Sequence, residues 1–140
     1  MSSTWRTSRS TCSEAAARHA LIPVVSLERS AAQCCRECLI ADANNDIEIS
    51  PASYWEIAIK ISLGKDSLPE RYEVFVEREI AANDFRILPI IPKHTAALTA
   101  MPFHHRDPFD RLLIAQAIVE VIPIVSADPT FDAYPIRRLW

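Results

Sequence analysis

One segment in the C-terminal half restricts the fold more than any other part of the chain. It has the sequence His104-His105-Arg106-Asp107-Pro108-Phe109-Asp110-Arg111-Leu112-Leu113-Ile114-Ala115-Gln116-Ala117. Asp107 is a good N-cap residue and Pro108 is tolerated in a first helical turn, so a helix is predicted to begin there. Asp110 then lies in the first turn of that helix, beside the positive end of the helix dipole.

A strand is predicted to follow this helix almost at once. The helix has an apolar face that we expect to be buried, formed by Leu113, Ile114, Ala117, Ile118 and Val121. Residues 122–126 form a short apolar run typical of a strand, and Asp128 comes just past its C-terminal edge, where open α/β sheets bind ligands. A helix followed directly by a strand indicates half of a βαβ unit, in which Asp110 and Asp128 are aimed at one place.

Length and composition describe one globular domain. The chain has 140 residues, of which 49% are hydrophobic and 24% are charged, with a formal net charge of −3. Because no overall basic field exists, contact with a polyanion has to depend on a local patch. No segment has the length of a membrane span or the apolar core of a signal peptide, so a cytoplasmic protein without membrane partners is expected.

Regular secondary-structure patterns begin near residue 39. We expect strands at 46–50, 85–90, 122–126 and 136–140, and helices at 52–63, from about 68 to 83, at 92–101 and from 108 onward. Ser50-Pro51 starts the helix at 52–63, with Trp55, Ile59 and Leu63 predicted to face inward, and Gly64, the only glycine, ends it. Strands that alternate with helices predict an α/β fold with a parallel sheet and helices on both faces.

Three acids on separate predicted elements carry whatever chemistry exists. Glu56 lies one turn into the helix at 52–63, and Asp110 and Asp128 flank the late strand. An acid beside a buried face is unfavourable unless it is solvated, paired or bound to a cation. Oxygen-only ligands suit Mg²⁺ or Mn²⁺, which can orient a water for attack on a phosphodiester. The interpretation is hydrolysis of a phosphodiester with Glu56, Asp110 and Asp128 as catalytic and metal-binding residues.

Ordinary structural roles explain the same acids, and spacing alone favours them. Asp110 is then a first-turn dipole residue, Asp128 caps a turn at Asp-Pro, Glu56 pairs with Lys60, and Asp107 is an N-cap rather than a metal ligand.

The basic residues near the acids also have two explanations. His104 and His105 form either a metal or phosphate contact or, more commonly, an exposed basic loop with Arg106. Three further basic residues form either a rim for a negative backbone or a solvated surface: Lys60, Lys65 and Arg111.

From about residue 39 to 140 the sequence resembles PIN-domain proteins of the VapC toxin type. The resemblance is carried by five segments in uninterrupted order: 49–60 (ISPASYWEIAIK), 63–65 (LGK), 85–90 (FRILPI), 104–117, and 124–128 (IVSAD). It implies a three-layer α/β/α fold around a central parallel sheet, and a Mg²⁺-dependent ribonuclease that is inhibited by an antitoxin protein. We also expect a homodimer.

The resemblance assigns the acids residue by residue. Glu56 matches the family's helix glutamate, Asp110 the aspartate before the Leu-Ile-Ala run, and Asp128 the acid after the late strand. Asp107 matches the additional aspartate of the Asp-Pro-Phe-Asp-Arg variant and is a further metal-ligand candidate with an open role.

The first 38 residues depart from the family pattern. Proteins of this family begin with a short apolar strand that ends in an aspartate and lies at the centre of the sheet, but here the first aspartate is Asp42. We hypothesise that residues 1–38 are an atypical segment, either an out-of-frame translation of the original first strand or disordered, ahead of a PIN-like domain at 39–140. The segment 21–27 is not expected to replace the strand, because Pro23 removes a ladder donor and no aspartate follows.

Three functions follow from these observations. The leading one is a VapC-like ribonuclease, impaired because one of four carboxylates is missing. The second is a catalytically inactive PIN-like module that binds an antitoxin or dimerises. The third is a small α/β protein whose acids are purely structural.

Overall fold

The computed structural model describes residues 23–26, 40 and 45–140. Their elements, in chain order, are β1 (Pro23–Ser26), β2 (Asp46–Ile49), α3 (Pro51–Ser62), α4 (Tyr72–Ala82), β3 (Arg86–Ile87), α5 (Pro92–Ala100), α6 (Pro108–Glu120), β4 (Ile124–Val125), the 3-10 helix η1 (Pro129–Ala133) and β5 (Arg138–Leu139). In this part of the chain, no helix is both long and apolar enough to cross a lipid bilayer.

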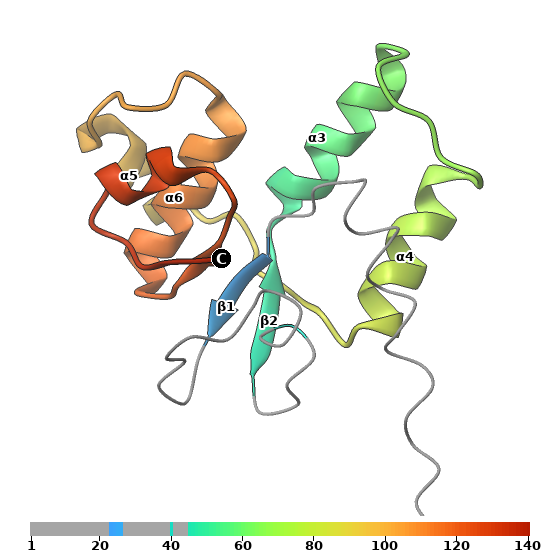
Figure 1. The fold of residues 1–140 in the computed structure, drawn as a ribbon, viewed down its shortest axis with the longest axis horizontal. Coiled ribbons are helices and arrows are strands. Elements are labelled where there is room, and N and C mark those ends of the chain that lie inside the picture. The colour runs from blue at the N-terminus through green and yellow to red at the C-terminus, as the bar shows by residue number, and fades with distance from the viewer. Residues whose placement is uncertain (1–22, 27–39, 41–44) are drawn as a thin grey trace, which may run out of the picture.

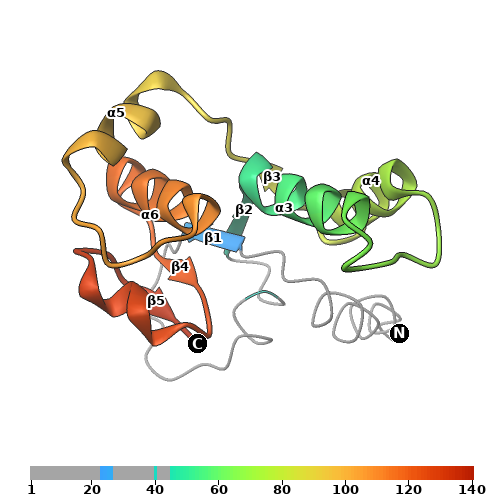
Figure 2. The same cartoon turned by 90° about the horizontal axis from the view of Figure 1, so that it is seen from above.

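A five-stranded sheet in the order β3-β2-β1-β4-β5 separates two helical layers. In Figures 1 and 2, α5 and α6 lie on one face of this sheet, and α3 and α4 lie on the other. The expected three-layer α/β/α fold is therefore confirmed. The predicted strands all appear, although each is shorter than its apolar run because only part of the run pairs with a neighbour.

The central strand is the atypical element of the sheet. The outer pairs β2–β3 and β4–β5 are parallel, as expected, but β1 is antiparallel to both β2 and β4. The segment that we expected to stay out of the sheet therefore fills its centre, and that prediction was wrong. The missing N–H of Pro23 is tolerated because Pro23 is the first residue of the strand.

The core is built mainly between the sheet and α6. Leu113, Ile114 and Ala117 of α6 pack with Ile124 of β4 in one buried cluster, which also includes residues of η1 and its C-cap. A smaller cluster joins Ile47, Val125 and Leu139, three residues on three different strands. Burial of these apolar side chains supplies most of the driving force for holding the layers together.

Helix α3 has the predicted boundaries but not the predicted buried face. The Ser50 hydroxyl accepts a hydrogen bond from the Ala52 amide at 3.1 Å, and Gly64 has a positive φ of 67° just after the C-cap. However, Trp55 and Leu63 are 55% and 61% exposed. Their expected inward orientation was wrong, because the side chains that α3 buries are those of Ala52, Ser53 and Ile57.

Helix α6 has the predicted buried face except at its last position. Leu113, Ile114 and Ala117 are buried, whereas Val121 is 86% exposed. Val121 is the C-cap of the helix in the left-handed conformation, with φ 57°, so the chain has already turned away from the core at that residue.

Candidate active site

Asp107 fixes the start of α6 and thereby the place of Asp110. Its carboxylate oxygen Oδ1 accepts hydrogen bonds from the amides of Phe109 at 2.8 Å and Asp110 at 3.4 Å. Pro108 is the first helical residue, as predicted. The N-cap role expected for Asp107 from its position is therefore confirmed, and Asp110 lies in the first helical turn.

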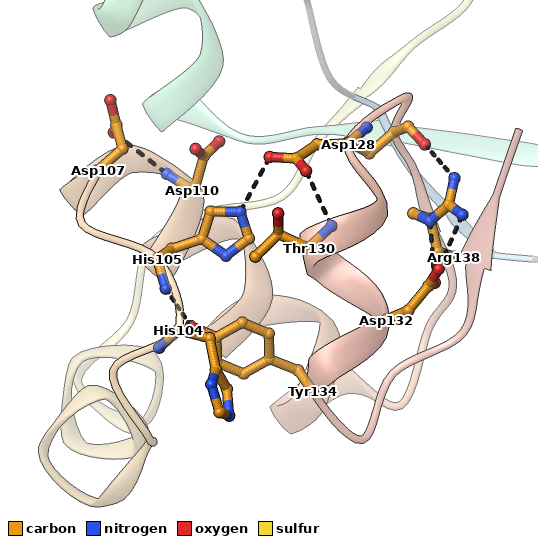
Figure 3. Close-up of polar contacts among 10 residues, drawn as sticks. His104, His105, Asp107, Asp110, Asp128, Thr130, Asp132, Tyr134 and Arg138 are labelled. Carbon is orange, nitrogen blue, oxygen red and sulfur yellow. Dashed lines mark hydrogen bonds and ion pairs between the residues drawn. The ribbon is translucent and has the colours of Figure 1, made fainter.

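Asp128 follows β4 and is held at both carboxylate oxygens. Oδ1 accepts a hydrogen bond from the Thr130 amide at 2.8 Å, and Oδ2 lies 3.1 Å from His105 Nε2 (Figure 3). The Asp128 amide in turn donates to the Ser126 hydroxyl at 3.1 Å. The hydrogen bonds from Thr130, followed by that from His105, lower the pKa of Asp128. Asp128 is thus the N-cap of η1, which confirms the turn role predicted from Asp-Pro.

His105 joins the loop before α6 to the segment that carries Asp128. It is buried, so its interpretation as part of an exposed basic loop was wrong. The Tyr134 hydroxyl accepts hydrogen bonds from the amides of His104 and His105 at 3.1 and 2.9 Å (Figure 3). The His105 ring also stacks on Tyr134 and meets Phe131 edge-on. Sequence inspection missed Tyr134, because its contact joins positions that no local pattern connects.

Glu56 reaches the same edge of the sheet from the other helical layer. It forms an ion pair with Lys60 at 2.6 Å, one turn further along α3, so the structural role predicted for it is realised. Helix α3 touches α6 through Trp55 and Phe109, whose ring centroids lie 5.3 Å apart in an edge-to-face arrangement. Glu56 and Asp110 are the next residues along their helices, and the charge of Glu56 is one of those that raise the pKa of Asp110.

The pKa of Asp110 reports how the acids surround it. Burial is the main cause that raises this pKa from 3.8 to about 6, and the negative charges of Asp107, Glu56 and Asp128 raise it further. His105 acts in the opposite direction. The predicted acids therefore share one electrostatic neighbourhood, in which burial and like charges disfavour the ionised form of Asp110.

The acids have the right chemistry for a divalent cation but not the right arrangement. Carboxylate oxygens are the ligands that Mg²⁺ and Mn²⁺ prefer. Within residues 23–26, 40 and 45–140, however, no three side chains of Asp, Glu, His or Cys are grouped so that they could hold one ion. Two of the acids already have partners inside the protein, since Lys60 binds Glu56 and His105 binds Asp128.

The direction of β1 explains why no carboxylate from the central strand joins this group. Asp128 and the start of α3 follow the carboxyl ends of β4 and β2. Because β1 is antiparallel, Pro23 pairs with Ile49 at that edge, whereas Ser26 pairs with Asp46 at the opposite edge. The C-terminal end of β1 thus points away from the acids, and the strand itself, Pro-Val-Val-Ser, contains no acid.

Arg111 cannot belong to a basic rim. Its guanidinium is buried and donates to the carbonyl oxygens of Leu98, Met101 and Pro102, and it lies 3.9 Å from the centre of the Phe103 ring. Arg111 therefore anchors the end of α5 and the following loop, and the predicted rim is reduced to Lys60 and Lys65.

The structure is an α/β/α fold in which acids gather near the carboxyl ends of β2 and β4. A family model described as PIN domain matches residues 18–136, and the chain belongs to this family. The match begins ahead of β1, so it includes part of the segment that departs from the family pattern. PIN-domain nucleases generally act on RNA or DNA and generally use divalent metal ions. No curated protein and no solved structure matches the chain.

Proposed function

We propose that this chain is a PIN-domain protein of the VapC toxin type whose ribonuclease activity is impaired. Its substrate is RNA, its catalytic and metal-binding residues by descent are Glu56, Asp110 and Asp128, with Asp107 as a further metal-ligand candidate, and its ion is Mg²⁺ or Mn²⁺. The main support is the antiparallel central strand, which brings no carboxylate to the edge where these acids lie.

The interactions that the remaining acids make within the protein also support impaired ribonuclease activity. A carboxylate that binds a divalent ion must be free to offer its oxygens, but Glu56 is paired with Lys60 and Asp128 with His105. With one carboxylate missing and two engaged, an ion would be bound weakly and the attacking water would be poorly oriented. Asp110 has no ion-pair partner among the described residues, and its acidic neighbours raise its pKa.

An RNA cleavage assay tests this proposal. The unmutated chain is incubated with a labelled single-stranded RNA and Mg²⁺ or Mn²⁺, beside Glu56→Gln and Asp110→Asn, with EDTA as the metal-free control. We expect slow, metal-dependent cleavage that both substitutions abolish. Cleavage that continues unchanged in both variants would show that these acids are not the catalytic residues.

The same internal pairings favour a second function, a catalytically inactive PIN-like module that binds an antitoxin or dimerises. It is the better description if the unmutated chain cleaves RNA no faster than Glu56→Gln and Asp110→Asn. Co-purification with the product of an adjacent small gene tests the antitoxin, and light scattering of the purified chain tests the homodimer. Absence of both partners together with absence of cleavage would leave only a structural role for the acids.

We further propose a cytoplasmic location and an altered origin for residues 1–38, which precede the regular part of the PIN-like domain at 39–140 but supply its central strand β1. The DNA upstream of the recognisable part, translated in the other two frames, is expected to encode a short apolar strand that ends in aspartate. If neither frame encodes such a peptide, the out-of-frame hypothesis is wrong.

A further inference from the structure

An aromatic pair lies beside the acids at the rim of the main core cluster. Trp55 is the residue before Glu56 on α3, and Phe109 is the residue before Asp110 on α6. Their rings meet edge-to-face with centroids 5.3 Å apart and an interplanar angle of 89°. The pair therefore bridges the two helical layers at the edge of the sheet where the acids gather.

The two rings differ in how firmly the fold holds them. Phe109 is partly buried and packs against the cluster around Leu113 and Ile114, so it is a fixed support. Trp55 leans on Phe109 but keeps 55% of its surface exposed. A large aromatic side chain that rests on a neighbouring ring and keeps more than half of its surface exposed can accept a flat partner without rearranging the fold.

We propose that Trp55, supported by Phe109, is a stacking platform for an unpaired base of single-stranded RNA. This inference rests on the proposed function, because it places the base next to the acids that would face the RNA backbone. Stacking of bases on aromatic side chains is a general means of binding single strands, and it does not depend on base identity. A base inside a duplex cannot reach such a ring, so the platform selects single-stranded substrates.

The charges around the pair are compatible with a nucleic acid strand. Lys60 lies one turn beyond Glu56 on α3, and the exposed Arg106 precedes the start of α6. Arg106 can contact a phosphate of the strand, whereas Lys60 is paired with Glu56 and would have to leave it to do so. Because Asp110 and its acidic neighbours repel phosphate, we expect the affinity to depend on stacking more than on charge.

Binding of RNA without cleavage tests the platform. Fluorescence anisotropy of an end-labelled, twelve-nucleotide single-stranded RNA is measured in EDTA, with a duplex of the same sequence and a strand with abasic sites as comparison probes. We expect the unmutated chain to bind the single strand at least several-fold more tightly than either comparison probe. Trp55→Leu, which keeps apolar surface but removes the aromatic face, is expected to weaken binding of the single strand about tenfold.

Two further variants separate stacking from general surface effects. Trp55→Phe keeps an aromatic face and is expected to bind within about threefold of the unmutated chain. Leu63→Ala removes another exposed apolar side chain, at the C-cap of the same helix, and is expected to have no effect on RNA binding. Thermal melting of each variant verifies folding, which should be preserved because both positions are exposed.

Three results would overturn the inference. The first is that Trp55→Leu binds the single strand as tightly as the unmutated chain does. The second is that the unmutated chain binds the abasic strand as tightly as the intact single strand. The third is that Trp55→Leu changes the protein from a dimer to a monomer without changing its RNA binding. The last result would make the aromatic pair a contact between protein chains. Because the assay measures binding in EDTA, a chain that cleaves no RNA can still confirm the platform, so failure of the proposed function is distinguished from failure of this inference.

Discussion

Replacement of Asp110 by asparagine is expected to stabilise the protein at neutral pH. The pKa of Asp110 is raised from 3.8 to about 6 by burial and by its acidic neighbours. At about 1.4 kcal/mol per pKa unit, this difference corresponds to roughly 3 kcal/mol as an upper figure for the cost of the ionised carboxyl in the fold. Because Asp110 is only half-buried and solvent screens part of the repulsion, we expect about 1–2 kcal/mol in practice.

The pH dependence of this effect has a definite sign. A carboxyl whose pKa is higher in the folded state binds more protons there than in the unfolded chain, so stability falls as pH rises from about 4 to 6. Because asparagine does not ionise, the variant does not lose stability through this position as pH rises. Asp110→Asn should therefore raise the free energy of unfolding by about 1–2 kcal/mol at pH 7.5, and the gain should nearly vanish near pH 4.

Thermal denaturation followed by circular dichroism at the two pH values measures the effect. A gain of about 1–2 kcal/mol should raise the melting temperature of the variant by roughly 3–8 °C at pH 7.5. Asp128→Asn is the matched control, because hydrogen bonds lower the pKa of Asp128, so its charge stabilises the fold at neutral pH and this stabilisation is lost on acidification. If Asp110→Asn melts below the unmutated chain at pH 7.5, or shows the same gain at both pH values, the electrostatic argument fails.

Two further substitutions test local structure, one at the C-terminal end of α6 and one beside the site. Val121→Gly should raise the free energy of unfolding by about 1 kcal/mol, because a β-branched residue is strained at φ 57° and its exposed side chain makes no core contact that would be lost. Urea denaturation measures the change, and an unchanged midpoint would contradict the presence of this strain. Tyr134→Phe should cost about 1–3 kcal/mol, because two backbone amides lose their common acceptor. Hydrogen exchange should then be faster at His104 and His105 than in the unmutated chain, and unchanged protection there would show that the hydroxyl does not hold the loop.

Helix boundaries could be predicted well because single residues determine them. Ser50-Pro51 and Asp107-Pro108 each combine an N-cap with a first-turn proline, and both helices begin there. Gly64 adopts the positive φ that made it a good terminator. These signals are local and depend on backbone stereochemistry, so they can be recognised without knowledge of the tertiary structure.

The side-chain environment at the site could be predicted only in part. Asp107 and Asp128 act as caps and Glu56 pairs with Lys60, all of which involve partners within four residues. His105 and Arg111 were misjudged because their burial depends on contacts with residues far along the chain or in a loop without regular structure. Trp55 looked like a core residue because helical periodicity shows which residues share a face, but not whether another element covers that face.

Strand direction is the property that sequence patterns leave most open, and here it decides the chemistry. An apolar run of four residues can pair in either direction, since alternation of side chains is the same when the strand is reversed. In β1 the reversal preserves the sheet, because the strand still pairs with β2 and β4, but it exchanges the two ends of the strand. If β1 were parallel to its neighbours, a carboxylate at its C-terminal end would lie near Asp110 and Asp128. In the antiparallel β1 observed here, a carboxylate at the C-terminal end would instead lie beside Asp46. The sheet of a PIN domain can thus be retained while the C-terminal end of its central strand points away from the other acids, so fold and activity have to be tested separately in this chain.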